Sequence, residues 1–179
     1  MIRIVVYGLP GPQGSKSFKG FRGGKAIMTE SSKKVAPWRQ DVKFAAERVR
    51  DGRPPMDGPL IARMVFTLPK PKSAPKTRRT FPDRTPDLSK LLRSTEDALT
   101  DAGIWADDAR VIGYSRAAKV FPGEDPEALE VPGVVIAVMT EAEAGALILE
   151  EYFSQWLPSR KDGVNLDFVQ EYRLTMGKQ

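Results

Sequence analysis

The order of apolar and polar positions predicts a mixture of strands and helices up to about residue 140. Short segments in which apolar residues alternate or dominate are typical of strands, and they occur at 2–7, 59–68, 109–121 and 133–139. Two longer segments carry apolar residues at helical spacing, and we expect helices at 37–50 and 88–101. Pro37 is tolerated in a first helical turn, and Gly103 follows the end of the second helix.

Two segments between these elements are rich in basic residues, glycine and proline. Residues 16–28 are typical of a basic hairpin or a mobile loop, with the charges on Lys16, Lys19, Arg22 and Lys25. Residues 69–86 contain five prolines and a single acid, and their basic residues are Lys70, Lys72, Lys76, Arg78, Arg79 and Arg84. Because positive charge is dense and backbone donors are scarce, we expect this loop to become ordered on contact with an anionic partner.

The chain changes character after Thr140. Residues 141–157 predict an acidic helix with apolar members, and a last amphipathic segment follows Pro158. We therefore expect the α/β (α+β) class, with a compact mixed sheet and flanking helices at 1–140. A C-terminal helical extension at 141–179 completes the predicted organisation.

Composition excludes several kinds of chemistry. The chain has no cysteine and no histidine, which removes disulfides, thiol nucleophiles, zinc–thiolate sites and imidazole bases. A hydrolase built from this sequence would rely on carboxylates, lysines or hydroxyls, and hard cations bound by Asp and Glu are the leading option. No apolar run approaches the roughly 20 residues of a membrane span, and the N-terminus lacks the pattern of a signal peptide. We expect a cytoplasmic protein with no membrane partner.

Charge is distributed unevenly along the chain. The net charge is +5, but residues 1–90 hold 20 Lys and Arg against 7 Asp and Glu, whereas residues 91–179 hold 8 against 16. Such a basic half favours binding to phosphates of a nucleic acid, since each placed cation releases condensed counterions. A solvated basic face without a partner is the alternative.

Carboxylates flank the second predicted helix. Asp87 precedes it, and Asp107 and Asp108 precede the following strand. Taken singly, Asp87 has the position of a helix cap, and the pair has the position of turn residues. Taken together beside a basic loop, they are the groups that metal-dependent phosphodiester hydrolysis requires. A helix of this length spans about 20 Å, so their convergence depends on how the strand packs back along the helix.

The same residues resemble a known family. The signature of RusA-type Holliday-junction resolvases is similar to Pro86-Asp87-Leu88, Asp97-Ala98-Leu99 and Trp105-x-Asp107-Asp108-x-Arg110-Val111. The N-terminal loop of phage members resembles Gly8-x-Pro10-x-Pro12-Gln13-Gly14-Ser15-Lys16. The resemblance covers residues 2–140. It implies a homodimeric, Mg²⁺-dependent endonuclease, with Mn²⁺ as an alternative metal, that cuts opposed strands of a four-way DNA junction. A phage-encoded member would act in the cytoplasm of the bacterial host.

The resemblance also implies roles for individual residues. The family's first catalytic aspartate falls on Asp87, and its later one falls on Asp108, with Asp107 beside it as a further metal candidate. The family's functional lysine falls on Arg93, which keeps the charge but cannot act as a base. The basic residues of 16–28 and 69–86 are then expected to hold DNA phosphates rather than to read bases.

One position departs from the family pattern. The second aspartate of the motif is replaced by Ser89, which Lys90 follows. A hydroxyl is a weaker metal ligand than a carboxylate, and a lysine adds positive charge where a cation should bind. A structure-specific DNA-binding protein with weakened catalysis is therefore one alternative function. A protein-interaction module that uses residues 141–179 is the other.

Overall fold

The computed structural model describes residues 1–14, 16–30, 32–75 and 77–147, with the backbone alone at 16–19 and 26–30. Lys76 and the predicted helical segments beyond residue 147 lie outside the described residues, so the expectations about them stay predictions. No helix of the described part is long and apolar enough to cross a membrane.

The main sheet has four strands in the order β1 (Ile2–Tyr7), β6 (Gly133–Thr140), β4 (Leu60–Thr67) and β5 (Val111–Val120). Strand β6 runs antiparallel to both of its neighbours, and β5 pairs in parallel with β4. The predicted mixed sheet is confirmed, and each predicted strand begins and ends within two residues of the observed one. Strands β1 and β5 form the two edges of this sheet.

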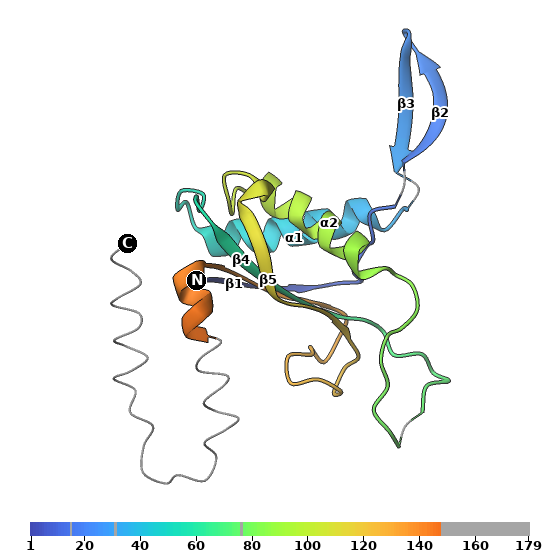
Figure 1. Cartoon of the computed structure of the whole chain (residues 1–179). Coiled ribbons are helices and arrows are strands. Elements are labelled where there is room, and N and C mark those ends of the chain that lie inside the picture. Colours follow the sequence, from blue (N-terminus) through green and yellow to red (C-terminus); the bar gives the residue numbers. More distant parts are fainter. Residues whose placement is uncertain (15, 31, 76, 148–179) are drawn as a thin grey trace.

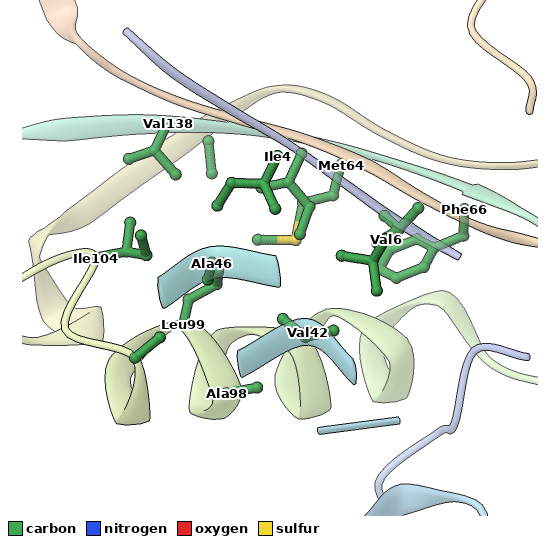
Figure 2. Packing of buried hydrophobic residues seen from close by; sticks show 14 of the residues in the cluster. Ile4, Val6, Val42, Ala46, Met64, Phe66, Ala98, Leu99, Ile104 and Val138 are labelled. Carbon is green, nitrogen blue, oxygen red and sulfur yellow. The ribbon is translucent and has the colours of Figure 1, made fainter. Parts of the chain in front are cut away.

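Both helices cover one face of the sheet (Figure 1). Helix α1 spans Val35–Arg50, two residues more at its start than predicted, and α2 spans Leu88–Asp101 as predicted. Figure 2 shows Val42 of α1 and Leu99 of α2 facing Met64 of the sheet, and all three are fully buried. Burying a side chain of this size contributes about 1.5–3 kcal/mol, so this layer is the main source of stability.

A short 3₁₀ helix, η1 (Asp108–Arg110), precedes β5 and was not predicted. It forms because the Asp107 carboxylate accepts a hydrogen bond from the backbone N–H of Ala109 at 2.8 Å. This contact is a local cap that the strand pattern at 109–121 did not indicate.

The basic segment near the N-terminus, expected to be either a hairpin or a mobile loop, forms a hairpin. Strands β2 (Lys16–Arg22) and β3 (Lys25–Glu30) pair with each other in a separate two-stranded sheet and project away from the helices and the main sheet (Figure 1). The turn is built by Gly23 and Gly24, whose φ values of 58° and 77° suit a tight hairpin turn. The hairpin therefore presents its tip to solvent.

The loop before the hairpin is held between the starts of the two helices. The Ser94 hydroxyl donates to the Gly11 carbonyl at 2.7 Å, and the Gln13 N–H donates to the Lys90 carbonyl at 2.9 Å. A Cβ atom at Gly11 would lie 2.3 Å from the Lys34 carbonyl oxygen, so only glycine fits there. The glycine-rich motif thus fixes the base of the hairpin beside the first turn of α2.

Residues 141–147 are helical and begin the predicted C-terminal extension. Ala144 is buried against Ala137 and Met139 of β6, in a small cluster separate from the main core. The boundary proposed near residue 140 and the protein-interaction role of 141–179 stay predictions.

Candidate active site

Asp87 occupies the N-cap position of α2, but its side chain does not cap the helix. Its Oδ2 atom instead lies 2.7 Å from the ammonium nitrogen of Lys90, and both side chains are half exposed. The hydrogen bond and charge of Lys90 lower the pKa of Asp87, and the charge of Lys119 adds to this effect. Asp87 is therefore an ionised carboxylate in a cationic setting.

Lys119 is a site residue that the sequence did not single out. Its ammonium group donates to the backbone carbonyls of Arg84 at 2.8 Å and Pro86 at 2.9 Å, so it joins the end of β5 to the segment before Asp87. It pairs in register with the buried Phe66 of β4. The sequence signal that could have identified it is a single lysine within the otherwise apolar segment 117–121.

Asp107 and Asp108 lie near the other end of α2. Asp107 caps η1, which confirms its interpretation as a turn residue, and Asp108 is exposed. Burial, and then the charge of Asp108, raise the pKa of the Glu96 carboxyl. The Tyr114 hydroxyl donates a hydrogen bond to Glu96. Sequence reasoning missed Glu96 because its partners come from separate elements.

One chain does not bring the predicted metal ligands together. Helix α2 is about 20 Å long, and β5 runs back along it from η1 to the Arg84–Pro86 segment. Strand β5 consequently delivers Lys119, not Asp107 or Asp108, to Asp87. Within the described residues, no three His, Cys, Asp or Glu side chains are placed to hold a metal ion. The described part of a single chain therefore does not fit an Mg²⁺ site.

The remaining positions of the motif lie on the exposed side of α2. Arg93 and Ser89 are both exposed, and the role of Arg93 stays a prediction. Lys90 forms an ion pair with Asp87. Its positive charge therefore lies at the carboxylate that is expected to bind the metal cation.

The predicted DNA-binding residues differ in their exposure and in their ion pairs. Arg22 and Lys25 are exposed at the hairpin tip, whereas the side chains of Lys16 and Lys19 are outside the description, as is Lys76. Two cations of the loop at 69–86 are paired within the chain, Lys70 with Glu124 and Arg79 with Asp125. The other three are exposed and have no ion-pair partner in the described part of the chain; they are Lys72, Arg78 and Arg84. The loop therefore takes an anionic partner from its own chain, which the sequence analysis did not foresee.

These features define the class as a mixed α/β protein whose cationic segments gather around the start of one helix, an arrangement suited to a polyanion. The family model described as Endodeoxyribonuclease RusA matches residues 8–138. Because this match covers more than half of the chain, the protein belongs to the RusA family, and membership implies the endonuclease activity of a Holliday-junction resolvase. The expected family is thereby confirmed. Comparison with curated proteins finds no match.

Proposed function

We propose that the chain is a metal-dependent endodeoxyribonuclease that resolves four-way DNA junctions by paired nicks and acts as a homodimer. The supporting observation is the position of Asp87, an ionised carboxylate between two basic segments. The hairpin and the loop at 69–86 both lie at the end of the molecule where α2 begins (Figure 1). DNA that follows these two segments would bring a backbone phosphate close to the first turn of α2.

Cleavage of a labelled synthetic junction tests this proposal. We expect paired nicks in the four-way junction with Mg²⁺, no nicks in a linear duplex of the same sequence, and no nicks with EDTA. Equal cutting of the duplex would contradict structure specificity, and cutting in EDTA would contradict metal dependence.

The separation of the carboxylates supports the proposed homodimer. If Asp87 and Asp108 act on the same phosphate, the second one must come from another copy, because the sheet and α2 hold them apart within one chain. The free edge of β5 offers a contact: it exposes 61% of Ile112 and 37% of Tyr114, and within the described part of the chain it pairs only with β4. Two β5 edges paired antiparallel would place the start of one strand beside the end of the other. Asp107 and Asp108 would then approach Asp87 of the second copy.

A junction-binding protein without nuclease activity is the second candidate. It is favoured by Ser89, which lacks the carboxylate of the family motif, and by the Lys90–Asp87 ion pair at 2.7 Å. Tight junction binding without nicks in either Mg²⁺ or Mn²⁺ would support this candidate over the nuclease.

A further inference from the structure

A single acidic side chain closes the base of the basic loop at 69–86. The Glu124 carboxylate pairs with Lys70 at the start of the loop. It also accepts hydrogen bonds from the backbone N–H of Thr80 at 3.0 Å and from the Thr80 hydroxyl at 3.0 Å. Glu124 therefore joins two positions that are ten residues apart in the chain.

Neighbouring acids anchor this contact to the sheet. Asp125, whose side chain is only 4% exposed, lies 2.5 Å from Arg116 of β5 and 3.4 Å from Arg79 of the loop. Glu127 accepts hydrogen bonds from Arg63 of β4 at 2.6 and 2.8 Å. Figure 1 shows the segment after β5 on the side of the sheet away from the helices. The loop is thus tied through the acidic turn at 124–127 to Arg63 of β4 and Arg116 of β5.

These acids are placed where electrostatics alone would disfavour them. Negative charges among the phosphate-binding cations reduce the attraction for a polyanion. Lys70 lowers the pKa of Glu124, with help from the hydrogen bonds of Thr80, and Arg116 lowers the pKa of Asp125, so both acids are charged at neutral pH. We infer that these acids favour DNA binding by ordering the loop at 69–86 in advance, since a loop that is already fixed loses less conformational entropy on binding.

We propose that Glu124 is a positioning residue for junction recognition, because it holds the basic loop so that Lys72, Arg78 and Arg84 meet the phosphates of a junction in a fixed arrangement. This inference rests on the proposed function. The opposite role is that of a competitor, in which Glu124 occupies Lys70 and Thr80 until DNA phosphates displace it. The two roles predict changes of opposite sign when the acid is removed.

Glu124→Gln tests the proposal, with Glu130→Gln as the matched control. Glu130 is exposed in the same segment and has no ion-pair partner in the described part of the chain, so its variant removes one charge without opening the loop. We expect Glu124→Gln to weaken four-way junction binding at least fivefold while duplex binding stays equal or rises, and Glu130→Gln to weaken neither. Junction binding by Glu124→Gln that equals or exceeds that of the control would overturn the proposal.

A second variant and a second measurement distinguish the ordering of the loop from the effect of removing a negative charge and from a folding defect. Thr80→Val removes a hydroxyl donor to Glu124 without changing the net charge, and we expect a smaller loss of junction binding of about twofold. Limited trypsin digestion of the full chain should cut after Lys72 and Arg78 several times faster in Glu124→Gln than in Glu130→Gln. Equal digestion rates would overturn the proposal even for a protein that binds no junction. Absence of junction preference in the parent, with faster digestion of Glu124→Gln, would instead contradict the proposed function and leave the positioning of the loop supported.

Discussion

At the scale of single residues, the candidate site combines one carboxylate with several cations. Asp87 faces Lys90 at 2.7 Å, and Lys119 holds the preceding carbonyls of Arg84 and Pro86. Such a setting stabilises the ionised carboxylate and attracts phosphate. Ser89 leaves the first turn of α2 without the second carboxylate that the family motif carries.

Ser89→Asp should therefore increase both stability and cleavage. A carboxylate in the first turn interacts favourably with the helix dipole, and we expect a gain of about 0.5 kcal/mol in the free energy of unfolding. A second carboxylate beside Asp87 should also raise the Mg²⁺-dependent rate of junction cleavage about tenfold. Urea unfolding and single-turnover cleavage measure the two effects. Ser89→Asn is the uncharged control, and a rate for Ser89→Asp no higher than for Ser89→Asn would show that the serine is not limiting.

At the scale of elements, two segments outside the helices present the positive charge. The hairpin β2–β3 carries Arg22 and Lys25 at its tip, on a turn set by two glycines. The loop at 69–86 is held from the opposite side by the acidic turn at 124–127. One segment is thus shaped by local backbone geometry, and the other by two ion pairs with the acidic turn, Lys70–Glu124 across 54 residues of sequence and Arg79–Asp125 across 46.

The acidic turn should make stability depend on pH in the acid range. Neighbouring cations, Lys70, Arg116 and Arg63 respectively, lower the pKa values of Glu124, Asp125 and Glu127, so the folded state favours their charged forms. Their contribution is present above about pH 4, the ordinary pKa of carboxyl groups, and is lost as the pH falls below it. Asp125→Asn should lower the free energy of unfolding by about 2 kcal/mol at pH 7. Urea unfolding between pH 2.5 and 7 should show this difference from the parent shrinking in acid, whereas a constant difference would contradict the ion-pair account.

The hairpin should contribute to DNA affinity through phosphate contacts. Arg22→Ala with Lys25→Ala should reduce the slope of log K against log salt by about 1.8, because each phosphate contact contributes about 0.9. Titrations of a junction between 50 and 200 mM salt measure the slope. Arg48→Ala on the exposed side of α1 is the control, and an unchanged slope in the double variant would place the hairpin outside the DNA interface.

At the scale of the whole molecule, the cations gather where α2 begins, whereas Asp107 and Asp108 lie towards its other end. The open edge of β5 links these two regions, since the strand starts at η1 and ends beside the segment before Asp87. In a dimer paired along that edge, the cationic region of each copy would lie beside Asp107 and Asp108 of the other copy. This arrangement would occur twice, once at each end of the paired strands. Such an arrangement matches a substrate with two equivalent strands to cut.

Much of the element pattern was predictable from the sequence, because it depends on local periodicity. Helix α2 and strand β1 begin and end where apolar spacing and turn residues indicated. The signature residues around Asp87 were also visible as a motif. The direction of β5 along α2, the role of Lys119 and the binding of the loop by Glu124 were not, since each depends on contacts between distant segments. The prediction that Asp87 and Asp108 share a site therefore stays a prediction, and a second copy of the chain would satisfy it.

Complementation between two inactive variants tests the central claim most directly. Asp87→Asn and Asp108→Asn are each expected to abolish junction cleavage, with Asp101→Asn as a control that cleaves normally. Co-expressed in one heterodimer, the first two variants leave one complete pair, Asp87 from one chain and Asp108 from the other. We expect this heterodimer to regain Mg²⁺-dependent nicking at one strand per junction. No cleavage by the mixed dimer, with an active parent, would contradict a site shared between two chains.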